Sequence, residues 1–139
     1  MAARTKARKR ALDLLFEAEQ RQVNVGELLR ERLAVPVTEA PLSEFTGDLV
    51  SGVVEHWTQI DELIATYSRG WTLGRMPAVD RNVLRVAVFE LLWQADEVPA
   101  PVVIDEAVRL VAGLSTDESP AFVNGVLARI LDQRGRLAV

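Results

Sequence analysis

The sequence of 139 residues contains no cysteine, a single histidine and only 6% aromatic residues. The absence of cysteine excludes thiol chemistry, disulfide bonds and thiolate metal ligands. His56 has no second histidine to complete a metal set, so we expect no metal site and interpret His56 as a structural residue. The glycines follow no phosphate-binding pattern. We therefore expect a protein without a cofactor that is not an enzyme.

The sequence also lacks a long apolar run. It has no stretch of 18 uncharged apolar residues, and its first ten residues carry charge where a secretion signal would be apolar. These features predict a cytoplasmic protein that does not associate with membranes. The length fits one domain over residues 1–139, and an apolar content of 49% is sufficient for a core.

Charge is distributed unevenly along the chain, although the formal net charge is only −4. The first ten residues hold five of the sixteen lysines and arginines and no acidic residue, so the rest of the chain is strongly acidic. Cations in the first turns of a helix oppose its macrodipole, at a cost of about 0.3–1 kcal/mol each. A polyanionic ligand would compensate for this cost. Charge alone also fits a solvated basic tail, and both interpretations stay open.

Apolar residues recur at three- and four-residue spacing along most of the chain, which predicts an all-α fold of about seven helices. Asn24 followed by Glu27 is typical of a capped helix start, and a third helix is expected to begin at Ser43. The prolines within 35–42 predict a loop, which is the best candidate for a subdomain boundary. The helices are expected over 5–21, 25–33, 43–54, 58–70 or 61–70, 79–93, 101–113 and from 119 onward, with 71–77 irregular.

The start of the last helix carries a second candidate site. Phe122, Gly125 and Arg129 follow an i, i+3, i+7 spacing, so they share one side of the helix at the edge of its buried face. Phe122 could stack on an unpaired RNA base, Gly125 could let a ribose approach the backbone, and Arg129 could hold a phosphate. The alternative is that Phe122 belongs to the core.

Four segments of the chain, in order, resemble the NusB family. They are RKRALDLLFEAE over 8–19, VDRNVLR with the residues that follow it over 79–91, the segment 98–108, and FVNGVL over 122–127. The resemblance implies two three-helix bundles with an added helix. It also implies a role in transcription elongation complexes that prevent termination at ribosomal RNA genes, through boxA-type single-stranded RNA and a NusE-type small-subunit ribosomal protein.

The resemblance also implies roles for particular residues. The RNA contacts carried over by position are Arg4, Lys6, Arg8, Lys9, Arg10 and Phe122. The partner surface would include Phe16 and Asp80, whereas Arg81, Arg85 and Glu90 are expected to be structural residues that pair within the bundle. A structural homodimer and an RNA-binding module of an RNA-modifying assembly remain alternatives. Salt-dependent RNA binding would distinguish the homodimer from both RNA-binding interpretations.

Overall fold

The computed structural model describes residues 3–35 and 41–137, and within these ranges the chain forms helices and connecting turns without a β-strand. The seven α-helices are α1 (Ala3–Arg21), α2 (Val25–Ala34), α3 (Glu44–Glu55), α4 (Trp57–Tyr67), α5 (Ala78–Trp93), α6 (Ala100–Leu114) and α7 (Ser119–Gln133). Two short 3-10 helices are η1 (Leu73–Arg75) and η2 (Arg134–Arg136). The predicted all-α fold of about seven helices is confirmed.

Side-chain caps fix two of the predicted helix starts. The Asn24 carboxamide oxygen accepts a hydrogen bond from the backbone N–H of Glu27 at 3.1 Å. The Ser43 hydroxyl accepts one from the backbone N–H of Thr46, also at 3.1 Å. Each cap satisfies a donor that the first helical turn leaves unpaired. α4 begins at Trp57, slightly before the predicted start, because His56 ends α3 and its carbonyl already accepts the first bond of α4.

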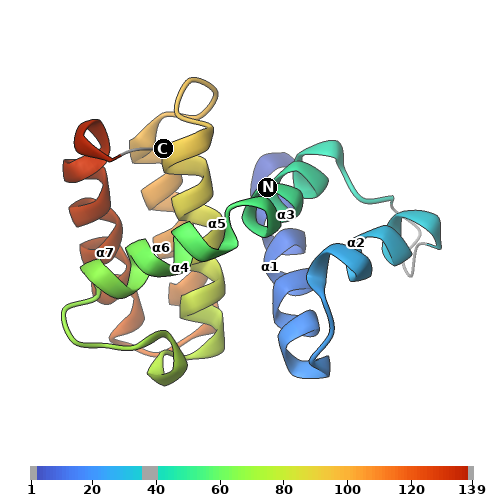
Figure 1. The fold of residues 1–139 in the computed structure, drawn as a ribbon, viewed down its shortest axis with the longest axis horizontal. Coiled ribbons are helices and arrows are strands. Elements are labelled where there is room, and N and C mark those ends of the chain that lie inside the picture. Colours follow the sequence, from blue (N-terminus) through green and yellow to red (C-terminus); the bar gives the residue numbers. More distant parts are fainter. Residues whose placement is uncertain (1–2, 36–40, 138–139) are drawn as a thin grey trace.

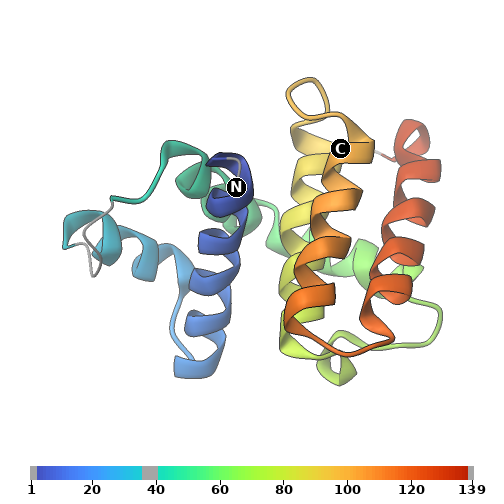
Figure 2. The ribbon, with the colours of Figure 1, turned by 180° about the vertical axis from the view of Figure 1, so that it is seen from behind.

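The helices form two bundles that lie side by side (Figure 1; Figure 2 shows the reverse side). α1, α2 and α3 pack on one another in the first bundle, and α4 to α7 make up the second. The predicted subdomain boundary at 35–42 falls largely on residues outside the described ranges. The helices on either side of it, α2 and α3, lie in the same bundle, and the chain passes between the bundles at His56.

α5 is the central helix, as its apolar residues on several faces predict. Twelve of its sixteen residues are buried, and it packs on helices of both bundles. Gly52 on α3 allows α3 and α5 to approach closely, because a Cβ atom there would lie only 2.0–2.5 Å from the ring of Phe89 on α5. The ring of His56 stacks on Trp93 with centroids 4.1 Å apart. Both contacts help to join α3 and its C-cap residue, His56, to α5.

Candidate nucleic-acid interface

The first turns of α1 present a cluster of cations at the protein surface. Arg4 and Lys6 are exposed, and Lys9 and Arg10 are partly exposed. The first turn contains no acidic residue, so nothing in it offsets the unfavourable interaction of the cations with the helix dipole. We name these four residues the basic end of α1. A surface of this kind favours an anionic ligand.

Local contacts hold two members of the basic end. The Arg4 guanidinium lies 4.6 Å from the centre of the Phe45 ring, a cation–π contact with α3. The Lys9 ammonium is 2.6 Å from the Asp13 carboxylate one turn along α1, and both side chains remain about half exposed. Exposed pairs of this type contribute little to stability, so Lys9 can exchange Asp13 for another anion at low cost.

Arg8 differs from the other predicted RNA contacts, and its placement corrects that prediction. Its side chain is only 4% exposed. The Arg8 Nε donates to both carboxylate oxygens of Glu90 on α5, at 3.1 and 3.0 Å, and Nη2 donates to one of them at 2.8 Å. Burial raises the pKa of Glu90, and the hydrogen bonds from Arg8 act in the opposite direction. The guanidinium of Arg8 therefore joins the two bundles and does not face a ligand.

Phe122 at the start of α7 is partly exposed and contacts a residue that the sequence analysis did not single out. The Trp71 ring lies edge-on to it, with centroids 6.4 Å apart and planes at 65°. Trp71 is 55% exposed. Both rings line a groove of about 650 Å³ that also contains Arg75. The signal for Trp71 was its position in a segment without helical periodicity, where a large aromatic residue has no expected place in the core.

Gly125 and Arg129 contact each other, which corrects the role predicted for Gly125. The Arg129 Nε donates to the backbone carbonyl of Tyr67 at 2.9 Å. A Cβ atom on Gly125 would lie 3.1 Å from Nη1 of Arg129, so this guanidinium occupies the space predicted for a ribose. Arg129 therefore fastens α7 to the end of α4. Desolvation, followed by the nearby charge of Arg69, lowers the pKa of Arg129.

The basic end of α1 and the Phe122 groove lie on different sides of the molecule. The Thr5 hydroxyl donates to Glu106 in the first half of α6 at 2.9 Å, whereas the groove includes Thr116, just beyond the last residue of α6. Both views show α1 beginning toward the upper side of the molecule and α7 beginning toward the lower side (Figures 1 and 2). The structure does not bring the two predicted groups of RNA contacts together.

The two residues predicted for a partner surface differ in their exposure to solvent. Phe16 is 38% exposed and therefore available for contact with another molecule. Asp80 is only 2% exposed, and its carboxylate accepts hydrogen bonds from the hydroxyls of Ser115 at 2.6 Å and Ser119 at 2.8 Å. Asp80 is thus corrected to a structural role, in which it ties the start of α5 to the connection between α6 and α7.

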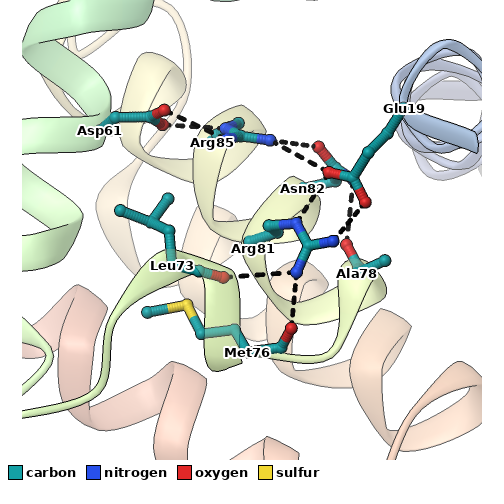
Figure 3. Close-up of polar contacts among 8 residues, drawn as sticks. All are labelled: Glu19, Asp61, Leu73, Met76, Ala78, Arg81, Asn82 and Arg85. Carbon is teal, nitrogen blue, oxygen red and sulfur yellow. Dashed lines mark hydrogen bonds and ion pairs between the residues drawn. The ribbon is translucent and has the colours of Figure 1, made fainter. Parts of the chain in front are cut away.

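Figure 3 shows the polar contacts around Arg81 and Arg85 of α5. The Arg81 guanidinium bonds both carboxylate oxygens of Glu19 on α1 and the backbone carbonyl of Met76. The Arg85 guanidinium bonds both carboxylate oxygens of Asp61 on α4, at 2.8 and 3.1 Å. The predicted structural role of both arginines is confirmed. The Arg85–Asp61 pair lies within the second bundle as expected, whereas the Arg81–Glu19 pair joins α5 to α1 of the first bundle.

Two kinds of site are absent from the part of the chain that the structure describes. In 3–35 and 41–137, no three histidine or acidic side chains are arranged to hold a metal ion. No helix in the same ranges combines the length and the apolar character needed to cross a membrane.

The fold and the site define an all-helical protein of two bundles with an exposed basic helix end. The model of the NusB family matches residues 5–132. The transcription antitermination protein NusB of Beutenbergia cavernae is 56% identical over 139 positions, covering 94% of this chain and 90% of the relative. The protein of the same name from Thermobifida fusca is 53% identical over 137 positions, covering 99% and 94%. The chain therefore belongs to the NusB family.

Solved structures agree with this assignment. NusB of T. maritima superimposes with a TM-score of 0.81 at 32% identity, covering 98% of this chain and 99% of the other. A chain in the crystal structure of antitermination factors NusB and NusE in complex with dsRNA gives a TM-score of 0.77 at 30% identity, covering 93% and 96%. The predicted fold and family are both confirmed.

Proposed function

We propose that this protein is a cytoplasmic transcription antitermination factor that binds single-stranded boxA-type RNA together with a NusE-type ribosomal protein. It would act within a transcription elongation complex at ribosomal RNA genes, and it would carry out no catalysis. The observation that carries the proposal is the basic end of α1, where four exposed or partly exposed cations gather. The names of the relatives support the antitermination role, and the solved complex of NusB and NusE with dsRNA supports binding of RNA and of a NusE-type protein.

The basic end would bind the RNA backbone. Each lysine or arginine that neutralises a phosphate releases condensed counterions, so the affinity depends on salt. Exposed side chains such as Lys6 can reach phosphates without breaking a contact of the fold, and Lys9 needs only to leave Asp13. Arg8 has no part in this binding, because its guanidinium is already paired with Glu90.

The test compares two triple variants that lose the same charge. The variant Lys6→Ala, Lys9→Ala, Arg10→Ala removes cations from the basic end, and the control Arg30→Ala, Arg109→Ala, Arg136→Ala removes exposed cations elsewhere. In a titration of fluorescently labelled single-stranded RNA, we expect the first variant to bind more weakly. Its slope of log affinity against log salt should flatten by about 2, at about 0.7 per lost phosphate contact.

Three outcomes would contradict the proposal. If the two triple variants lose affinity equally, the attraction is general and the basic end is not the site. If the unmodified protein does not bind RNA at all and sediments as a dimer, the structural homodimer becomes the better interpretation. RNA binding that is strong but independent of a NusE-type protein would leave the RNA-modifying assembly as the alternative.

Phe16 is the residue we propose for the NusE-type partner. It is a large aromatic side chain, 38% exposed, on the part of α1 beyond the basic end. A buried aromatic residue is a common anchor of protein interfaces, so Phe16→Asp should abolish co-purification with the ribosomal protein while RNA affinity measured without it is unchanged. Retained co-purification would remove Phe16 from the partner surface.

A further inference from the structure

The start of α3 is fixed against the first turns of α1. The hydroxyl of Thr46, a buried residue, donates a hydrogen bond to the backbone carbonyl of Ala7 at 3.0 Å. The same hydroxyl lies 3.0 Å from that of Ser43, the N-cap of α3. These bonds tie the first turn of α3 to α1 close to Arg4. Phe45 precedes Thr46 in this turn, so its ring has a fixed place beside the basic end of α1.

The ring of Phe45 contacts two arginines of α1 that differ in what else they bind. Its centre is 4.6 Å from the guanidinium carbon of Arg4 and 5.4 Å from that of Arg8. Arg8 is buried and bonded to Glu90. Arg4 is exposed and forms no ion pair within 3–35 and 41–137. The cation–π contact with Phe45 is therefore what orients the guanidinium of Arg4.

A guanidinium that rests on an aromatic ring keeps its charge and its N–H donors. The group is planar and weakly hydrated, so it can contact a ring while its N–H groups still reach a phosphate oxygen. A mobile arginine side chain loses rotational freedom when it binds a ligand, and a side chain that is already ordered loses less. A ring beside Arg4 therefore strengthens phosphate binding by this residue without adding a contact to the ligand.

Nearby carboxylates would attract Arg4 if the ring were absent. Burial raises the pKa of Glu90, and the charge of Arg4 acts in the opposite direction together with Arg8, so Arg4 lies within electrostatic reach of this carboxylate. Glu106 on α6 lies close enough for its negative charge to act on Glu90 as well. Without the ring of Phe45, the Arg4 side chain would be drawn toward these two carboxylates and away from solvent.

We infer that Phe45 is a positioning residue of the RNA site, which holds the Arg4 guanidinium ready for a phosphate and acts through Arg4 alone. The inference rests on the proposed RNA-binding function and adds a residue of α3 to it. Arg4 lies one turn before Arg8, on the side of α1 that faces the rest of the fold, whereas the other cations of the basic end point away from it. Phe45 thus supports the cation that extends the basic end around the start of the helix.

The first experiment is a double-mutant cycle between Phe45 and Arg4. Binding of a labelled single-stranded 12-nucleotide RNA of mixed sequence should weaken about 2- to 12-fold in Phe45→Leu, the range expected for ordering one long side chain. Phe45→Tyr keeps the ring and should restore most of the affinity. In an Arg4→Ala background, Phe45→Leu should have no further effect, because the residue that the ring positions is gone.

Salt dependence separates a positioning residue from a cation that neutralises a phosphate. Arg4→Ala removes a charge, so its slope of log affinity against log salt should flatten by about 0.7. Phe45→Leu leaves that charge in place, so its affinity should fall by the same factor at every salt concentration. NMR gives a measurement without RNA. A ring shields protons above its face, so the Arg4 Nε–H resonance should move downfield in Phe45→Leu and stay in place in Phe45→Tyr.

Leu63→Ala on α4 controls for loosening of the fold. Leu63, like Phe45, is a partly buried apolar residue packed against the core, but it lies in the second bundle. This control should lower the melting temperature and leave the RNA affinity of the folded protein unchanged. Each affinity is referred to the folded fraction of the variant, measured by circular dichroism.

The outcomes distinguish this inference from the proposed function. If the triple variant of the basic end loses affinity but Phe45→Leu does not, the role of Phe45 is wrong and the proposed function stands. If the unmodified protein binds no RNA, both fail. Equal losses from Phe45→Leu with and without Arg4 would show that the ring contacts RNA itself or acts through the fold, and either result overturns the inference. A loss in Leu63→Ala as large as that in Phe45→Leu would overturn it too.

Discussion

Both ends of α1 are tied to α5 by an arginine–glutamate pair, but water reaches only one of them. Near the start of α1, Arg8 and Glu90 are 4% and 1% exposed. Near its end, Glu19 is 27% exposed and Arg81 18%. Desolvation is expensive for a buried pair and small for a partly exposed one, so the same chemistry has different consequences at the two ends.

The comparison shows that a basic cluster in a sequence is not a single functional unit. Arg4, Arg8 and Arg10 lie within seven positions of one another on one helix. Arg8 alone points toward α5, where Glu90 bonds it, whereas Arg4 and Arg10 reach the surface. The direction of each side chain around the helix decides whether its charge serves packing or a ligand.

Replacement of Arg8 by alanine should produce the largest effect on stability. It leaves the Glu90 carboxylate buried without its partner, which typically costs about 3–5 kcal/mol in the free energy of unfolding. The measurement is urea denaturation at neutral pH. Lys9→Ala is the matched control on the same helix, with an expected change within about 0.5 kcal/mol because its pair is exposed.

A double variant makes this comparison more specific. In Arg8→Met, Glu90→Leu no uncompensated charge is left, so the protein should regain most of the stability that Arg8→Ala loses. A double variant as unstable as Arg8→Ala would show that the hydrogen-bonded geometry, and not the desolvated charge, holds this junction. A small loss in Arg8→Ala itself would contradict the burial of the pair.

Most of the fold was predictable because helices leave local signals. Periodic apolar residues gave the helices, and Asn24 and Ser43 marked two of their starts. The division into bundles was not predictable from the positions of the prolines. The prolines near 35–42 suggested a boundary there, but the chain crosses between bundles at His56, where a short junction between two helices carries no proline and little sequence signal.

The candidate site was less predictable than the fold, because it depends on contacts between residues far apart in the sequence. The family resemblance implied a partner surface for Asp80, yet its carboxylate is buried and bonded by Ser115 and Ser119, and neither contact has a sequence signature. Trp71 was missed because its contact with Phe122 joins residues far apart in the sequence, although its position in a segment without helical periodicity was a signal. The exposed cations of α1 were found because charge composition alone identifies them.

Replacement of Glu19 by alanine should have a smaller effect than Arg8→Ala. Burial raises the pKa of Glu19, but hydrogen bonds and charge from Arg81 outweigh it, so the pKa is lowered overall and the carboxylate is stabilised by the fold. Loss of a partly exposed pair that also joins the bundles should cost about 1–2 kcal/mol, between the values for exposed and buried pairs.

The measurement for Glu19→Ala is again urea denaturation, with Glu55→Ala at an exposed position as the control. A cost equal to that of Arg8→Ala would mean that exposure to water does not distinguish the two ends of α1.

The smallest effect concerns pH and a third carboxylate, Glu17. Hydrogen bonds from Arg32 and then from Arg21 lower its pKa from 4.5 to about 2. Arg32 approaches from α2, at 2.8 Å between Nη1 and Oε1, so this pair lies within the first bundle. A lowered pKa means that the folded state holds the charged form more firmly than the unfolded state does.

The contribution of Glu17 to stability should therefore be complete above pH 4.5 and disappear as the pH falls toward about 2. Because solvent screens the pair, we expect about 1 kcal/mol or less. The pKa of Glu90 is raised by burial, so its contribution changes above pH 4.5, in a separate range and with the opposite sign. The stability difference between the unmodified protein and Glu17→Gln, measured by urea denaturation at pH 6, 5 and 3, isolates Glu17. That difference should be constant from pH 6 to about 5 and shrink at pH 3; a difference that stays the same at all three values would show that the Arg32 pair contributes no charge-dependent stability.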